Sequence, residues 1–288
     1  MPKTTMASQK RLQLALSRTD HLLTRLSVLL STPSGVDTTL LTITYTLTFL
    51  HARLSTLLRH QLEKIALSVA KKASETLLPG ETLIADIPAP APTKRVARAL
   101  DASKQLSNLI SDFRIFVRLW GLLGIYSWAK STYLAGPKDK VIKSLIWAQV
   151  ISNIFYQFLE NGAYLASKNV LKWSPEKQTR WWLWSSRFWA AHVVLDFGRL
   201  ARVWQLQSKE NQVVKDTVED NKEKEDKIRK AEVEAWWRET VVNAAYAPLT
   251  YHWSVEQGAV SEAWVGFLGM VAGVVGLRQK WKVTAAVI

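Results

Sequence analysis

The sequence predicts an all-α fold: a membrane-associated helical bundle with amphipathic helices and a C-terminal glycine-rich membrane helix. Three observations predict it. Runs with apolar residues at three- and four-residue spacing recur along the chain, and no second strand-like pattern exists to pair with a first. The 38 Lys and Arg outnumber the 24 Asp and Glu and give a net charge of +14, which favours an anionic partner. The 14 Trp favour anionic membrane lipid, because Trp concentrates where an apolar phase meets water.

Several classes of function are disfavoured by what the sequence lacks. Without Cys there is no disulfide, thiolate metal site or cysteine nucleophile. We find no phosphate loop, metal-ligand spacing or catalytic triad, so we expect no enzyme, no catalytic residue, no cofactor and no metal. His192 and Asp196 are spaced as a helical i, i+4 pair, and we interpret them as a structural hydrogen bond or ion pair. Trp and Gly cluster in apolar segments rather than between basic residues, so we expect no nucleic-acid partner.

The first third of the chain is predicted to hold one long helix. After an N-terminal segment (1–36), an amphipathic helix is expected over 37–79, with Asp37 as its N-cap. Within it, residues 41–49 alternate apolar residues with Thr, which is typical of a strand. We predict a helix there, because the same residues fit a helical spacing that continues unbroken after them. A Pro-rich linker (80–93) is expected to be extended.

The middle region, 94–207, is predicted to contain amphipathic and membrane-embedded helices. A first helix runs from about residue 93 to 136 with a break near Gly121 or Gly124, and a second runs from about 138 to 162, where Gly162 is read as a C-terminal cap. A third helix starts at Pro175 and ends near Gln207. Residues 208–234 form a charged, solvated segment, and 235–288 a C-terminal membrane-anchoring region with a helix over 235–246.

The helix that begins near residue 94 is the predicted membrane-binding element. On a helical wheel most of its large apolar residues share one face, and its polar side carries a basic excess. Leu100 and Ile115 intrude on that polar side. An ordinary core-facing helix would show the same periodicity, so burial in a protein bundle stays open as the alternative. The residues predicted to bind the membrane are Lys94, Arg95, Arg98, Lys104, Leu106, Ile110, Phe113, Arg114, Val117, Arg118 and Trp120.

The C-terminal apolar segment, 263–277, is predicted to enter a membrane. It carries no charge, and Trp264 and Trp281 flank it as interfacial anchors. A 15-residue helix spans about 22 Å, which is short of a hydrocarbon core of about 30 Å. Small residues gather on one side of it, as closely packed membrane helices require. The residues predicted to pack there are Gly266, Gly269, Gly273 and Gly276.

A narrow polar stripe interrupts the otherwise apolar helix over 138–162. Gln149, Asn153, Tyr156 and Glu160 follow one another at spacings of four, three and four, and therefore share a face. We expect hydrogen bonds across a helix interface. The alternative is a pore lining, which would make the chain a pore-forming or metabolite-transport protein.

Four segments in this order resemble the peroxin-eleven family of peroxisomal membrane proteins. They are SDFRIFVRLWGLLGIYSW (111–128), NIFYQFLENGAYLASKNVL (153–171), WSSRFWAAHVVLDFGRLARVWQL (184–206) and GFLGMVAGVVGLRQKW (266–281). The resemblance implies a helical, self-associating protein of the peroxisomal membrane that elongates the organelle and cooperates with dynamin-type fission machinery. The family's membrane-bending helix maps onto 94–118. We therefore predict membrane remodelling by amphipathic-helix insertion and homo-oligomerisation, which promotes peroxisome proliferation and fission.

Overall fold

The computed structural model describes residues 3–75, 78, 90–214 and 222–286, and every element in that part of the chain is helical, as predicted. In chain order the elements are α1 (Lys3–Leu30), α2 (Pro33–Ser74), α3 (Ala91–Val117), the 3₁₀ turn η1 (Arg118–Trp120), α4 (Gly121–Ala135), α5 (Lys140–Ser167), α6 (Pro175–Val214), α7 (Lys222–Ser254) and α8 (Glu262–Thr284).

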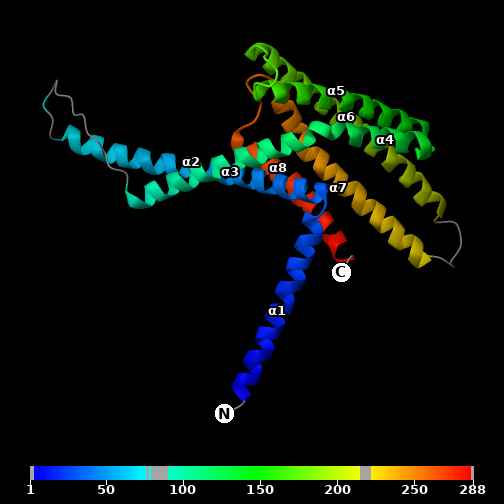
Figure 1. Cartoon of the computed structure of the whole chain (residues 1–288), viewed down its shortest axis with the longest axis horizontal. Coiled ribbons are helices and arrows are strands. Elements are labelled where there is room, and N and C mark those ends of the chain that lie inside the picture. The colour runs from blue at the N-terminus through cyan, green and yellow to red at the C-terminus, as the bar shows by residue number, and fades with distance from the viewer. Residues whose placement is uncertain (1–2, 76–77, 79–89, 215–221, 287–288) are drawn as a thin grey trace.

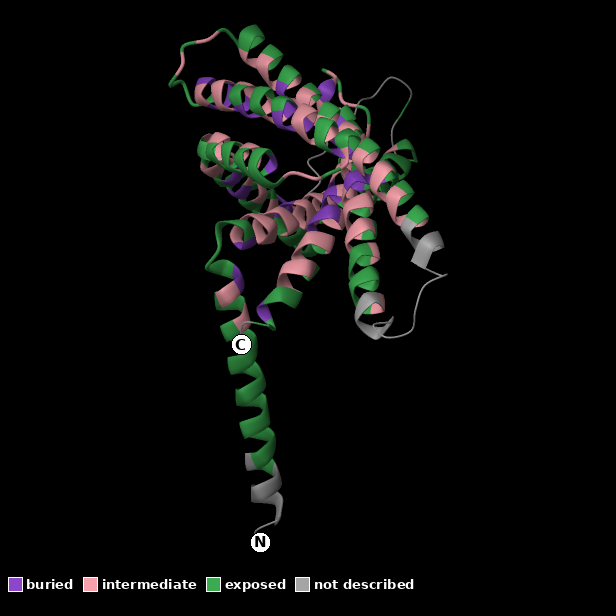
Figure 2. Cartoon of the chain, turned by 90° about the vertical axis from the view of Figure 1, so that its right-hand side faces the viewer, coloured by how far each residue is buried: buried purple, intermediate pink, exposed green. Residues whose placement is uncertain are grey.

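The helices form two groups that α7 connects. In Figure 1, α5 and α6 lie side by side with α4 next to them, while α2 lies along α3 and α8. Helix α7 packs against both α6 and α8 and so joins the groups. Helix α1 projects away from both, and Figure 2 shows it exposed over most of its length. Fully buried side chains lie where helices cross, among them Val150, Val193 and Leu249.

The Thr-rich run is helical, which confirms that prediction. Helix α2 begins earlier than predicted, because the Thr32 hydroxyl accepts a hydrogen bond from the Gly35 amide at 3.0 Å and caps the helix. The prediction of Asp37 as the N-cap was therefore wrong. Hydroxyls within the run donate to carbonyls four residues back, as Thr42 does to Thr38 at 2.8 Å. These local bonds let Thr residues occupy a helix interior.

The break predicted near Gly121 is present as η1, between α3 and α4. The linker prediction was wrong at its end, because residues 91–93 form the first turn of α3 with Pro92 near its start, where a missing N–H has no cost. Residues 79–89 lie outside the described part of the chain.

Several other predicted helix ends were wrong, and among them α6 continues past Gln207 to Val214. Helix α5 continues past Gly162, where a Cβ would come within 2.7 Å of Trp181 and 2.9 Å of Trp173. Gly162 is thus a site of close packing rather than a cap. Helix α7 reaches from Lys222 to Ser254, well beyond 235–246. Most of the predicted charged segment is therefore helical, in 208–214 and 222–234, while 215–221 are not described.

None of the described helices is both long and apolar enough to cross a membrane. The predicted C-terminal membrane helix is a helix, α8, but its crossing of a bilayer is not confirmed.

Candidate membrane-binding surface

Helix α3 turns one side toward α2. Leu100, Ile110 and Arg114 are buried on this side, with 5%, 9% and 9% of their surfaces exposed. The Arg114 Nε donates to Asp37 Oδ1 of α2 at 2.8 Å. Ile110 and Arg114, which we predicted at the membrane surface, thus lie inside the helical packing. The same arrangement explains why Leu100 lies among polar residues on the helical wheel. That part of α3 is covered by α2.

Arg118 ties the end of α3 to α5. Its Nη2 and Nε donate to the two oxygens of Glu160, at 2.9 and 3.1 Å, and the Tyr156 hydroxyl donates to the same carboxylate at 2.9 Å. Burial opposes the charge of Arg118, but the neighbouring Tyr156 and Glu160 raise its pKa overall. Val117 beside it is half-buried. Arg118 therefore holds the break in place rather than facing outward with the other basic residues.

The other side of α3 carries an exposed apolar stripe. Its members follow a spacing of three and four residues from α3 through η1 into α4, so they share one side of a continuous helical path. We call this set the outer stripe: Leu106 (47% exposed), Leu109 (67%), Phe113 (47%), Phe116 (48%), Trp120 (56%) and Leu123 (69%). Large contiguous apolar surfaces of this kind mark protein or membrane contacts.

Basic residues lie at the N-terminal end of the outer stripe. Lys94, Arg95, Arg98 and Lys104 are exposed, and the described part of the chain offers none of them an ion-pair partner. Arg95 precedes Phe113 by 18 residues (113 − 95), about five helical turns, and so lies on the same side of α3. Helix α3 therefore presents Arg95 in the same direction as the apolar stripe, whereas Lys104 lies about half a turn away from it.

The break in this surface is fixed by α5. The Asn161 Nδ2 donates to the carbonyl of Leu119 in η1 at 2.7 Å, and so satisfies a backbone group that the break leaves free. Gly121 packs so closely on the Gln157 side chain that a Cβ there would collide with it. The outer stripe thus bends at a defined point.

The glycines of α8 lie against α2. A Cβ at Gly269 would collide with the Tyr45 ring, and one at Gly266 with the backbone of Phe49. Gly273 approaches Leu41 and Thr42, and Gly276 approaches Thr38. The small residues predicted to serve close helix packing thus face a helix of the same chain. Through this contact α8 holds α2 in the position where α2 packs against α3.

The polar stripe of α5 forms hydrogen bonds across helix interfaces, as we expected. Gln149 Nε2 donates to Asp196 Oδ1 of α6 at 2.8 Å, and Asn153 Nδ2 donates to His192 Nδ1 at 2.7 Å. Tyr156 and Glu160 complete the stripe through the contacts of Arg118. With every member bonded within the helical packing, the pore lining is not favoured.

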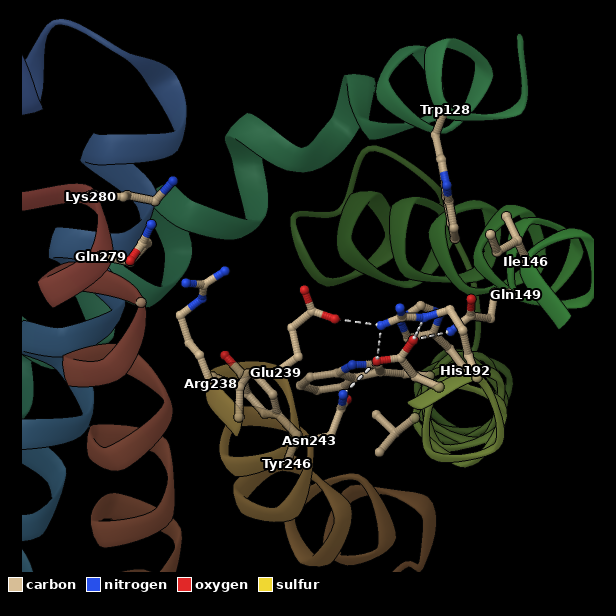
Figure 3. Close-up of a pocket in the computed structure, with 16 residues that line it drawn as sticks. Trp128, Ile146, Gln149, His192, Arg238, Glu239, Asn243, Tyr246, Gln279 and Lys280 are labelled. Atoms are coloured by element: carbon tan, nitrogen blue, oxygen red, sulfur yellow. Dashed lines mark hydrogen bonds and ion pairs between the residues drawn. The ribbon is translucent and has the colours of Figure 1, made fainter. Parts of the chain in front are cut away.

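Asp196 joins three helices and is one of the residues that line a cleft of about 680 Å³. Figure 3 shows this cleft, with Gln149 and Asn243 among the labelled residues. Besides Gln149, Asp196 accepts from Asn243 Nδ2 of α7 at 2.5 Å and from Arg199 Nε at 2.6 Å. Burial works to raise the Asp196 pKa, but these hydrogen bonds lower it overall. Burial lowers the pKa of His192. His192 and Asp196 thus each form structural hydrogen bonds with other side chains and not with one another.

Comparison with known proteins decides the family. The family described as Peroxisomal biogenesis factor 11 (PEX11) matches residues 92–281, which is well over half of the chain. The chain belongs to the PEX11 family. An uncharacterized protein of Schizosaccharomyces pombe is 28% identical over 180 residues, which cover 62% of this chain and 76% of the relative. No solved structure matches.

PEX11 proteins are peroxisomal biogenesis factors, so this chain has a role in peroxisome biogenesis and proliferation. The matched region starts at the second residue of α3 and ends within α8. It therefore contains the outer stripe, its basic end and the glycines of α8. Helices α1 and α2 lie outside it, although α2 covers the inner side of α3.

The sequence pattern missed part of this PEX11 surface. Leu109, Phe116 and Leu123 belong to the outer stripe but were not among the predicted residues, while Ile110 and Arg114 were. The three- and four-residue spacing through the break could have found Phe116 and Leu123. Asp37, which fixes Arg114, had no local signal because 77 residues separate the two.

Proposed function

We propose that this PEX11 protein resides in the peroxisomal membrane and elongates it by inserting the outer stripe of α3 into one leaflet. The observation that carries the proposal is the exposed outer stripe with unpaired cations at one end. An apolar wedge in one leaflet enlarges that leaflet relative to the other, and the difference favours curvature.

The energies suit reversible attachment to an anionic surface. Full burial of a large apolar side chain contributes about 1.5–3 kcal/mol, but burial at an interface is partial, so the stripe contributes roughly 5–10 kcal/mol gross. Each basic residue near an anionic leaflet adds about 1 kcal/mol. Ordering the protein at the surface opposes both contributions.

Self-association would concentrate these wedges into an elongated tubule, and the tubule would then be cut by dynamin-type fission machinery. Resemblance to other peroxin-eleven proteins supports both steps. Exposed leucines along α1, such as Leu12 (60% exposed) and Leu23 (60%), offer surface for such contacts outside the stripe.

The first test measures how the purified full chain floats with vesicles that contain anionic lipid. Leu109→Glu and Phe113→Glu, made singly, should each reduce the bound fraction strongly, because each places a charge in the stripe. Asn108→Glu is the matched control, since Asn108 is exposed beside Leu109 but lies off the stripe. It adds the same charge and should retain most binding.

The second test measures peroxisome length in cells that overproduce each variant. We expect elongated organelles with the unaltered chain and with Asn108→Glu, and organelles of normal length with the stripe variants. Equal vesicle binding and equal elongation by Leu109→Glu, Phe113→Glu and the control would show that the stripe is not the inserting element.

A further inference from the structure

A second cavity, separate from the outer stripe, lies inside the helical packing. It has a volume of about 440 Å³, within the range of about 300–1,000 Å³ that small-molecule sites occupy. Helices α2, α3, α5, α6 and α7 and the turn η1 all contribute to its lining. The polar side chains used below are Tyr45, Arg114, Arg118, Glu160 and Tyr246.

The carboxylate in the lining, Glu160, is already paired with Arg118. Both Glu160 oxygens accept hydrogen bonds from Arg118, and Tyr156 and Gln157 add one more each. With 7% of its side chain exposed, Glu160 compensates Arg118 at close range. The carboxylate therefore leaves little acceptor capacity toward the cavity.

Arg114 faces the cavity with most of its donors free. A guanidinium has five N–H donors, and within the described residues Arg114 uses only its Nε, toward Asp37. The Asp37 side chain is 39% exposed, whereas that of Arg114 is 11% exposed. Solvent screens Asp37 more than Arg114, so positive charge remains directed at the cavity.

Two tyrosine hydroxyls add to this donor excess. The described part of the chain provides no hydrogen-bond partner for the hydroxyl of Tyr45 or of Tyr246, and both line the cavity. Burial raises the pKa of both, which keeps them protonated as donors. Both tyrosines are half-buried, so their free hydroxyls open into the cavity and can donate to an acceptor that enters it.

The rest of the lining is apolar and aromatic. Trp189 stacks on Trp253 with ring centroids 5.4 Å apart, and Trp182, Leu41 and Ile115 extend the wall. Such a wall favours an apolar chain rather than a fully hydrated ion.

We propose that this cavity binds a single-chain anionic amphiphile. Its carboxylate or phosphate head accepts hydrogen bonds from Arg114, Tyr45 and Tyr246, and its chain lies along Trp182, Trp189 and Trp253. The proposal goes beyond membrane remodelling and does not depend on the outer stripe.

The experiment uses the full chain, purified in a neutral maltoside detergent so that apolar tails without an anionic head are already in excess. Dodecyl phosphate and laurate are titrated separately below their micelle concentrations, and inorganic phosphate is titrated alone. Tryptophan fluorescence follows binding, and native mass spectrometry counts bound molecules. Saturable binding of one molecule of dodecyl phosphate or laurate is expected, at least about tenfold tighter than inorganic phosphate; which amphiphile binds identifies the head.

Two variants test the position of the head. Tyr45→Phe with Tyr246→Phe keeps both rings and removes both hydroxyls, and should weaken binding about tenfold. Ser186→Leu fills part of the cavity and should also weaken it. Tyr251→Phe is the matched control, because Tyr251 is 61% exposed and outside the cavity.

Circular dichroism melting confirms that each variant is folded. Absence of saturable binding above the detergent background would overturn the proposal. Equal affinity of inorganic phosphate, or an unchanged affinity in the double Tyr variant and in folded Ser186→Leu, would overturn it as well. Leu109→Glu should bind the amphiphile normally, so failure here and failure of membrane remodelling are distinguishable.

Discussion

At the scale of single residues, the polar groups on α5 and α6 stabilise the fold. Asp196 accepts from Gln149, Asn243 and Arg199, which belong to α5, α7 and α6. A buried carboxylate with three donors of this kind joins elements that are distant in sequence. Its value depends on all partners being present, because a buried group without a partner is costly.

Asp196→Ala should lower the free energy of unfolding by about 3 kcal/mol, because it leaves a partly buried Arg199 and two buried amides without their acceptor. Chemical denaturation in neutral detergent measures the change. Asp20→Ala, on exposed α1, is the control and should change stability by less than about 0.5 kcal/mol. A loss no larger than that of the control would show that the network contributes no net stability.

The pH dependence of stability should carry a contribution from His192. Burial lowers its pKa below 6.5, and its Nδ1 accepts from Asn153, so the folded state holds the neutral ring. Below pH 6.5 the unfolded chain binds a proton that the folded chain does not, so this contribution is present above 6.5 and is lost as pH falls. His192→Gln should flatten the decline in unfolding free energy between about pH 7.5 and 5.5.

His21→Gln is the control for that measurement, because His21 is exposed on α1. It should leave the decline unchanged. If His192→Gln also leaves it unchanged, the buried ring does not govern stability in this range.

At the scale of elements, glycines set the distance between α8 and α2. Gly269 meets the Tyr45 ring so closely that no larger residue fits without displacing it, whereas a Cβ at Gly124 in α4 would have no neighbour within 4 Å. Gly269 is therefore required for close helix packing and Gly124 is not, a difference that the sequence alone does not show.

Gly269→Ala should destabilise the fold by about 1–3 kcal/mol, because the added methyl overpacks the α2 and α8 interface. Gly124→Ala should be neutral or stabilising by up to about 1 kcal/mol, since Ala favours a helix and has open space there. Thermal unfolding of both variants provides the comparison. Equal shifts in Tm would contradict close packing between α2 and α8.

The helices could be predicted from the sequence because their signals are local. Apolar spacing, Pro175 at a helix start and the glycines near the break are all read within a few turns. Helix ends were less predictable: Gly162 has the residue type of a cap, but the indoles of Trp173 and Trp181 occupy the space beside it. That contact depends on how α5 and α6 pack.

For the molecule as a whole, the packing of the other helices determines which side of α3 is covered. Periodicity identified an amphipathic helix but not its orientation. Helix α2 covers the side with Leu100 and Arg114 and leaves Leu109 and Phe113 exposed. The ion pair to Asp37 fixes that orientation, and no local pattern in the sequence could have indicated it.

This orientation places the basic end of α3 where it can add to membrane binding through charge. Binding of the full chain to anionic vesicles should weaken as salt rises from about 0.05 to 0.5 M, because the screening length falls well below 10 Å. Charge reversal of Lys94, Arg95 and Arg98 together should remove much of this salt dependence while residual binding through the outer stripe persists. Vesicle flotation across the salt series measures both quantities.

The matched control reverses Lys10, Arg11 and Arg18, which are exposed on α1 and change the net charge by the same amount. It should retain the salt dependence, because a local surface potential acts only within about a Debye length of the membrane. Equal effects of the two triple variants would mean that the overall charge of +14, rather than the basic end of α3, attracts the protein to the membrane. A larger effect at α3 would place that end of the helix at the lipid surface, as the proposed insertion of the outer stripe requires.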